Sequence, residues 1–276
     1  MKTRLITSAI GIALVIGALI IGESVPVVLA VVMALICAII SGEYLSAKKL
    51  HTELILSIPC VLFAFLIPLL SFFDLHLIFF YIFVTVTAVL TVVFHSQLKA
   101  DNVMFALGGV LLFIICFTLF VRMMAEQSYR AFWVILGLGV PWLSDSAAYF
   151  VGRKLGKRKL CPVISPKKTV EGAVGGIIGG VLGAVVIGLV FLLIYRGVTI
   201  NFWYLILVGV VNSVVSVFGD LFFSVIKRSC DIKDYGTIMP GHGGLLDRFD
   251  SVIFCIPLLY ILSKYAVVIS TSVMII

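Results

Sequence analysis

The sequence contains little charge. Charged side chains make up 12% of its 276 residues, about half the share found in soluble globular domains. By contrast, 62% of the residues are hydrophobic and the mean hydropathy is +1.27. No polar stretch between the apolar runs is long enough to form a separate soluble domain. These absences exclude an ordinary soluble fold and predict a protein that crosses a membrane several times.

The sequence also lacks the cysteine spacing of a disulfide or zinc framework. None of its six cysteines forms a Cys-x-x-Cys pair, and most lie within apolar runs: Cys37, Cys60, Cys116, Cys161, Cys230 and Cys255. Disulfide scaffolds and zinc sites use cysteines at short, regular spacings. We therefore interpret these cysteines as small apolar side chains of the interior.

Basic residues outnumber acidic ones by 20 to 13, which gives a formal net charge of +7. They lie in short loops between apolar runs instead of on a folded basic face, which argues against nucleic acid as a partner. Membrane lipids with anionic headgroups and phosphorylated substrates are the partners we expect.

The chain contains instead a series of apolar runs, each close to the ~20 residues that a helix needs to cross the hydrocarbon layer. Because the runs are continuously apolar and do not alternate every second residue, they favour helices over barrel strands. We predict an all-α polytopic membrane protein of about nine transmembrane helices, at residues 5–22, 25–41, 54–72, 75–94, 103–121, 131–152, 171–194, 202–226 and 251–270. The first run resembles a signal peptide, but its length favours a retained helix.

The distribution of basic residues predicts how the chain crosses the membrane. Sixteen of the 20 Lys and Arg residues fall at the N-terminus or in the loops that follow the even-numbered spans. Such an excess marks the cytoplasmic side. We expect a multi-pass protein of the inner cell membrane, with its N-terminus, loops 153–170 and 227–250 and active site facing the cytoplasm and its C-terminus outside.

The two halves of the chain differ in their ionisable residues. Residues 1–130 contain almost none within their spans, whereas residues 131–276 combine the remaining spans with both basic loops. We predict an N-terminal transmembrane scaffold of about five helices and a C-terminal catalytic region of about four. Small residues at every fourth position let helices approach closely. Two such ladders, Gly172-Gly176-Gly180 and Gly175-Gly179-Gly183, face either a helix of the same chain or a second copy in a homodimer.

Two aspartates lie inside predicted spans, Asp145 about seven and Asp220 about six residues before the cytoplasmic end. At 1.5 Å per residue, both lie roughly 10 Å below that end. An ionised Asp in hydrocarbon costs about 2.5 to 3.5 kcal/mol, so it faces a cavity or a partner; a hydrogen bond between helices is the alternative interpretation. Because Mg2+ prefers hard oxygen ligands, we predict a magnesium site that includes these two carboxylates.

Two further aspartates precede the last span. Asp247 and Asp250 are three residues apart, so they share a face if the helix has begun. We expect both to join the metal site. Pairing with Arg248, or capping of the helix by Asp250, is the alternative.

The loop before the span at 171–194 contains two basic clusters. The first, Arg153 to Lys159, is explained by anionic lipid at the cytoplasmic surface. The second, Ser165-Pro166-Lys167-Lys168, lies where a helix begins, and the N-terminal end of a helix offers unpaired N–H groups to phosphate. We predict that Ser165, Lys167 and Lys168 bind phosphate.

The stretch from Ser224 to Asp250 combines charges of both signs with several glycines. Its cationic side chains are Lys227, Arg228, Lys233 and Arg248. Glycines allow backbone N–H groups to turn towards an anion. We predict phosphate contacts from Ser224, Gly241, His242, Gly243 and Gly244, with His242 as a phosphate or ribose contact and not as a proton-transfer group.

Three segments carry a specific pattern. They are D-S-A-A-Y-F-V-G-R-K-L-G-K from Asp145, S-P-K-K-T-V-E-G from Ser165, and S-x-x-K-R-x4-K-D-x-G-x3-P-x-H-G-G-x-x-D-R-x-D from Ser224. In this order they resemble the phosphatidate cytidylyltransferase family, also called CDP-diacylglycerol synthases. Met239 stands where that pattern has Leu, Ile or Phe, a change of similar apolar volume. The N-terminal half resembles the family only in its apolar spans.

The resemblance implies that CTP and phosphatidate react to give CDP-diacylglycerol and pyrophosphate, with one or two metal ions, Mg2+ among them. Given that chemistry, we expect the following residues to be catalytic: Asp220, Asp247, Lys227, Arg228 and Arg248. Asp220 and Asp247 are then the metal ligands that we expect first, and Asp145 is a third candidate. Asp250 is expected to contact these ligands and not the metal directly. The lysines and arginines of both loops contact the phosphates.

Two other functions remain open at this point. A CTP-dependent kinase of a polyprenol-type lipid uses similar groups but releases CDP. A secondary transporter would use Asp145 and Asp220 to couple ions, but such folds often contain inverted repeats, and no close internal repeat is evident here.

Overall fold

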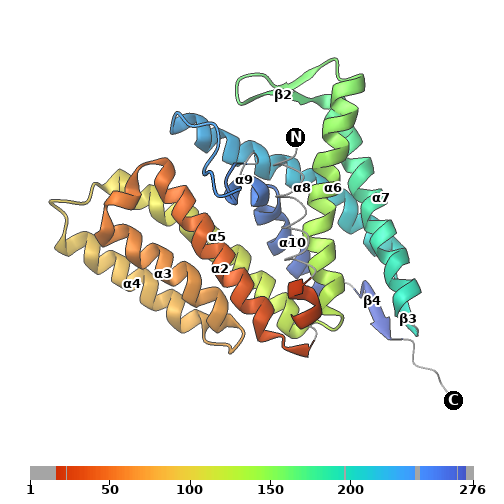
Figure 1. Ribbon diagram of the computed structural model, residues 1–276, viewed down its shortest axis with the longest axis horizontal. Coiled ribbons are helices and arrows are strands. Elements are labelled where there is room, and N and C mark those ends of the chain that lie inside the picture. Colours follow the sequence, from red (N-terminus) through yellow and green to blue (C-terminus); the bar gives the residue numbers. More distant parts are fainter. Residues whose placement is uncertain (1–16, 23, 196, 240–242, 266, 272–276) are drawn as a thin grey trace. The chain divides into compact units, whose positions relative to one another are not determined.

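The computed structural model of the chain describes residues 17–22, 24–195, 197–239, 243–265 and 267–271 (Figure 1). Most of the predicted span at 5–22 lies outside the described residues, as do Gly241 and His242. In the described part, seven helices are long and apolar enough to cross a membrane: α2 (Val27–Ala47), α3 (Leu54–Ser71), α4 (His76–Val93), α5 (Ala100–Glu126), α6 (Arg130–Leu155), α7 (Val170–Ile194) and α8 (Phe202–Ser229). The prediction of a mostly helical, polytopic membrane protein is confirmed.

The last predicted span is shorter than expected. Helix α10 (Val252–Tyr265) has 14 residues, fewer than the ~20 needed to cross the hydrocarbon layer. Strand β4 (Ile269–Thr271) follows and pairs antiparallel with β3 (Val198–Ile200). The prediction of one helix over 251–270 is therefore wrong beyond Tyr265. The β-branched residues of β4 suit a strand, and hydropathy alone does not distinguish a strand from a helix end.

A second small sheet precedes α7. Strands β1 (Lys159–Cys161) and β2 (Ser165–Thr169) are antiparallel, so the basic loop is partly a hairpin. The Thr169 hydroxyl accepts a hydrogen bond from the Gly172 N–H at 3.1 Å and caps α7. This N-cap ends β2 and starts the helix, so Lys167 and Lys168 have defined places on a strand.

The chain divides into two compact units. One contains residues 1–126 and 227–249, and the other contains residues 127–226 and 250–276. The segment 227–249, which includes the short helix α9 (Leu246–Phe249), thus groups with the N-terminal helices and not with the helices next to it in sequence. The division at residue 130 expected from the sequence followed chain order, whereas the observed units do not. The scaffold and catalytic roles of the halves stay a prediction.

The first unit is a bundle of α2, α3, α4 and α5. Helix α2 packs against α3 and α5, and α3 also packs against α4, as Figure 1 shows. Large aromatic side chains, among them Phe113, Phe117 and Phe120, are fully buried in it. The Tyr44 ring stacks on Phe105 with 4.5 Å between ring centroids. Burial of these rings stabilises the bundle and holds the C-terminal part of α2 next to α5.

The second unit is built around α6 and α7, which lie side by side (Figure 1). A Cβ placed on Gly176 would lie 3.0 Å from the Cβ of Ala148, and one on Gly179 would collide with Ala147. The glycine ladders therefore bring α7 against α6 of the same chain, and the predicted close packing is confirmed. A further face of α7 packs on α8, where Gly180 meets Ser213.

Candidate functional site

The second unit contains a group of polar side chains that we call the Asp220 cluster: Asp145, Lys168, Ser216, Asp220 and Ser224. Helix α8 contributes three of them at intervals of four residues, so that they lie on one face of the helix. Asp145 comes from α6 and Lys168 from β2. Three elements therefore bring together residues that are far apart in sequence, including both aspartates that the sequence placed inside spans.

An ion pair lies at the centre of the Asp220 cluster. The Lys168 Nζ lies 2.6 Å from Oδ2 of Asp220, with 24% and 27% of the two side chains exposed. The Ser224 hydroxyl donates to Oδ1 of Asp220 at 3.2 Å. Both oxygens of this carboxylate thus have a partner in a region mostly withdrawn from water, which lowers the cost of holding its charge there.

Asp145 adds a second carboxylate to the cluster. The Ser216 hydroxyl donates to its Oδ1 at 3.2 Å, and its charge interacts with those of Asp220 and Lys168. The Ser251 hydroxyl lies beside the same carboxylate, fully buried, but makes no hydrogen bond of normal geometry. One lysine therefore balances two carboxylates, and such a cluster has capacity for a further cation.

The first unit contains a second group of polar residues, which we call the Asp247 cluster: Glu43, Lys227, Tyr235, Gly244 and Asp247. Oδ1 of Asp247 accepts a hydrogen bond from Lys227 Nζ at 3.0 Å. Its Oδ2 accepts the backbone N–H groups of Tyr235 at 2.8 Å and Gly244 at 3.0 Å. The carboxylate therefore ties together the two ends of segment 235–244.

Lys227 is almost entirely withdrawn from water. Only 11% of its side chain is exposed, against 4% for Asp247, and its ammonium group also lies over the Tyr235 ring, 5.5 Å from the centroid. A buried ammonium group needs such partners, since an unpaired buried charge is very costly. The predicted Lys227 and Asp247 are thus in direct contact.

Sequence reasoning missed Glu43. Its carboxylate, on α2, accepts the backbone N–H groups of Leu245 at 3.0 Å and Leu246 at 2.8 Å, and the residue is only 6% exposed. The signal was an acidic residue at the end of an apolar run, in Ser41-Gly42-Glu43-Tyr44. The predicted span ended at residue 41 and left Glu43 in a loop, where an acidic residue needs no partner.

The other predicted residues have less distinctive surroundings. Lys167, Arg228, Lys233 and Arg248 are exposed, and Ser165 is half-buried. Nη1 of Arg228 donates a hydrogen bond to the Ile232 carbonyl at 3.4 Å. Gly243 has φ +88°, and its carbonyl accepts a hydrogen bond from the Met239 N–H. Oδ1 of Asp250 accepts a hydrogen bond from the N–H of its neighbour Ser251 at 2.8 Å, just before α10 begins. Their contacts with phosphate stay predictions.

Asp247 belongs to the first unit and Asp145, Asp220 and Asp250 belong to the second, so the predicted four-aspartate metal site stays a prediction. Among the described residues, no three His, Cys, Asp or Glu side chains are placed to hold a metal ion. Asp247 is already engaged by three donors, as given above. The pair of Asp145 and Asp220 is different, because Mg2+ in phosphate chemistry typically takes one or two carboxylates and completes its shell with water and substrate oxygens. With the buried Ser251 hydroxyl beside Asp145, these two carboxylates fit Mg2+.

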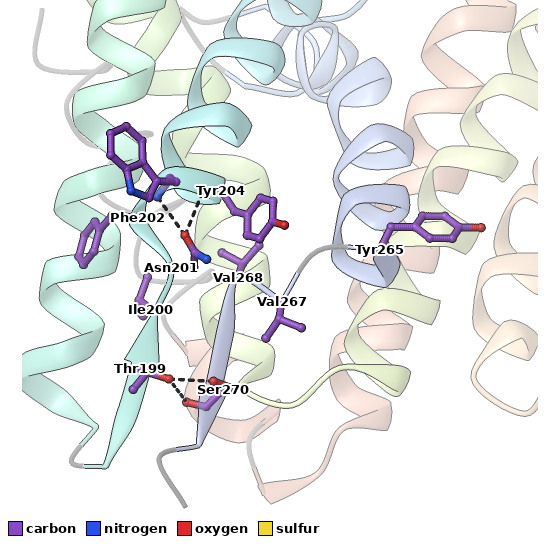
Figure 2. A pocket seen from close by; sticks show the side chains of 10 residues that line it. Thr199, Ile200, Asn201, Phe202, Tyr204, Tyr265, Val267, Val268 and Ser270 are labelled. Carbon is purple, nitrogen blue, oxygen red and sulfur yellow. Dashed lines mark hydrogen bonds between the residues drawn. The ribbon is translucent and has the colours of Figure 1, made fainter.

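The described residues of the second unit form at least two pockets. One, of about 740 Å3, is lined by β3, β4 and the start of α8 (Figure 2); its lining residues include Asn201, Tyr204 and Tyr265, but none with a charged side chain. The other, of about 320 Å3, lies between α8 and α10 and is apolar, lined by Val215, Phe218, Leu221, Phe222, Val225 and Phe254. The first lacks the groups for phosphate chemistry, whereas the second lies on the turns of α8 next to Asp220.

The chain matches known proteins. Residues 2–266 match the Cytidylyltransferase family. A phosphatidate cytidylyltransferase of Bacillus subtilis (strain 168) is 35% identical over 274 residues, 95% of this chain and 97% of that protein. One of Staphylococcus haemolyticus (strain JCSC1435) is 41% identical over 143 residues, 52% of this chain and 53% of that protein. One of Staphylococcus aureus (strain COL) is 40% identical over 130 residues, 47% of this chain and 48% of that protein.

Seven long apolar helices define an integral membrane protein, and two Lys–Asp ion pairs, Lys168–Asp220 and Lys227–Asp247, lie in its helical units. The matches with known proteins identify the family within this class of membrane proteins. The chain belongs to the cytidylyltransferase family, since the family match covers nearly all of it. It is thus an enzyme, a nucleotidyltransferase. The staphylococcal matches span only about half of those proteins, whereas the Bacillus match spans almost the whole length.

Proposed function

We propose that the protein transfers a cytidylyl group from CTP to phosphatidate, giving CDP-diacylglycerol and pyrophosphate for phospholipid biosynthesis. The observation that carries this proposal is the match over almost the full length of a protein named phosphatidate cytidylyltransferase. The pairing of Lys168 with Asp220 and of Lys227 with Asp247 supports it, because a reaction between two polyanions needs cations held at fixed positions.

The chemistry needs little more than positioning and charge neutralisation. A phosphate oxygen of phosphatidate, largely ionised at neutral pH, forms a new bond to the α-phosphorus of CTP, and the bond from that phosphorus to the bridging oxygen of the β-phosphate breaks. Pyrophosphate leaves with the electron pair, so no strong general base is required. We assign Lys168 and Lys227 to phosphate binding, because their ammonium groups are held in place by Asp220 and Asp247.

Asp145 and Asp220 would hold Mg2+ in this proposal. The ion would neutralise charge on the phosphates as they approach each other. The chain's own contribution is to keep two carboxylates close together, oriented by the Ser216 and Ser224 hydroxyls. The apolar pocket between α8 and α10 supports a lipid substrate, since it gives an acyl chain an apolar surface on the helix that carries Asp220.

An assay on the purified protein tests the function and the cofactor together. With phosphatidate and CTP labelled in its cytidine ring, we expect labelled CDP-diacylglycerol and one pyrophosphate per turnover. Removal of divalent cations with EDTA should abolish turnover, and Mg2+ should restore it, because two carboxylates and several phosphates otherwise repel one another. Formation of CDP with a phosphorylated polyprenol would establish the kinase alternative instead, and undiminished turnover in EDTA would contradict the magnesium site.

We further propose that loop 153–170 faces the cytoplasm of a cell whose inner membrane holds the protein, in line with its excess of basic residues. In a cysteine-free variant, Lys157→Cys should react with a membrane-impermeant maleimide only after the membrane is opened. The matched control is Thr199→Cys, at an exposed position on β3, which follows the other end of α7. This cysteine should react in intact spheroplasts. The reverse pattern would contradict the proposed orientation.

A further inference from the structure

Glu43 is an acidic side chain buried in an apolar helical bundle. It belongs to α2, within a stretch that is otherwise long and apolar enough to cross a membrane. Burying a carboxylate without partners is strongly unfavourable. Its partners are the N–H groups of Leu245 and Leu246, about 200 residues further along the chain. The contact therefore joins the N-terminal bundle directly to the segment that carries Asp247.

Two glycines make room for this carboxylate. A Cβ on Gly236 would collide with Glu43, whose atoms are its three nearest neighbours. A Cβ on Gly244 would lie 2.6 Å from Oε2 of Glu43 and 2.7 Å from the Gly236 nitrogen. The absence of side chains at these two positions thus has a local reason, which is to let the Glu43 carboxylate approach the backbone.

The same segment holds the Asp247 cluster in place. The two N–H groups bound by Glu43 immediately precede Asp247, which binds Lys227 and the N–H groups of Tyr235 and Gly244. Two neighbouring carboxylates therefore anchor four backbone N–H groups of one segment. Glu43 fixes where the backbone arrives at Asp247, and Asp247 fixes the Lys227 ammonium group.

We infer that Glu43 is a positioning residue of the enzyme: its carboxylate holds the backbone of Leu245 and Leu246 so that Asp247 and Lys227 keep the geometry that catalysis requires. The effect on turnover rests on the proposed function, while the effect on the segment's backbone does not. Glu43 itself acts through Asp247 and touches no substrate.

Glu43→Gln is the test, because it keeps the size of the side chain but replaces one acceptor oxygen by an N–H2 group that cannot accept. We expect kcat to fall ~10- to 100-fold, since small displacements of catalytic groups cost that much. KM for CTP should change less than kcat. Amide hydrogen exchange should accelerate in peptides from 233–239 and 243–249, and the melting temperature should stay close to that of the parent. Glu53→Gln, on a glutamate that instead binds Asn102, is the matched control.

A paired substitution sharpens the test. Gly236→Ala should lower turnover in the parent protein, because the new methyl group collides with Glu43. In a Glu43→Ala background the same change should have little further effect. Additive losses would overturn the inference, as would unchanged turnover in Glu43→Gln or a loss that merely follows a falling melting temperature. If the parent makes no CDP-diacylglycerol, the proposed function fails, yet hydrogen exchange in Glu43→Gln still decides whether Glu43 anchors this segment.

Discussion

Asp220→Asn is expected to reduce CDP-diacylglycerol formation by ~100- to 1,000-fold, the range seen when a charged or polar group that stabilises a transition state is removed. The substitution keeps the shape of the side chain and its hydrogen bond with Ser224, but it removes the charge that pairs with Lys168 at 2.6 Å. It also leaves Asp145 as the one carboxylate of the cluster. The measurement is kcat/KM for CTP at saturating phosphatidate and several Mg2+ concentrations.

The dependence on Mg2+ separates the two roles of Asp220. If it is a ligand, Asp220→Asn should require more Mg2+ for half-maximal rate, and Asp145→Asn should show the same shift. Asp101→Asn serves as the matched control, because Asp101 is exposed at the start of α5 and outside the cluster. Parent-like turnover of Asp220→Asn with an unchanged Mg2+ requirement would exclude Asp220 from the reaction.

Lys227→Met is expected to damage both stability and activity. The substitution leaves the Asp247 carboxylate, 4% exposed, without its cation, and breaking a buried ion pair in this way costs about 3 to 5 kcal/mol. The melting temperature in detergent should fall by several degrees, and turnover should fall more steeply, since the proposed phosphate contact is also lost. Lys99→Met, on an exposed lysine before α5, should change neither quantity.

The double variant Lys227→Met/Asp247→Asn distinguishes structure from chemistry. It removes both charges, so much of the lost stability should return, because a neutral amide is cheaper to bury than an unpaired carboxylate. Turnover should stay low, because the cation assigned to phosphate binding is still absent. Recovery of turnover together with stability would show that Lys227 has only a structural role.

The two aspartates of the spans show what sequence patterns are able to predict about a site. Asp145 and Asp220 stood out because ionised side chains are rare in apolar runs, and the structure brings them together with Lys168. Asp247 and Lys227 were also singled out, but as a metal ligand and a phosphate contact. Their contact with each other was not expected, because their separation of 20 residues spans a loop without a regular period.

The limits of hydropathy are clearest at the ends of the chain's spans. The apolar runs predicted α2 to α8 with ends that differ from the observed ones by at most six residues, because each helix meets its need for apolar surface locally. The run at 251–270 contains both a helix and a strand. Hydropathy did not predict the change from one to the other, because the run is predominantly apolar throughout. The glycine ladders indicated close packing, but only the structure identified α6 as their neighbour.

The sequence by itself determined the class of this protein: composition and run length establish a polytopic membrane protein, and the charged motifs indicate phosphate chemistry. These features depend on residues that are adjacent in the chain. The tertiary structure decided which donors meet which carboxylates. Glu43 binds Leu245 and Leu246 across more than 200 residues, and segment 227–249 groups with the N-terminal helices. Such contacts follow from how helices pack, and no local pattern encodes them.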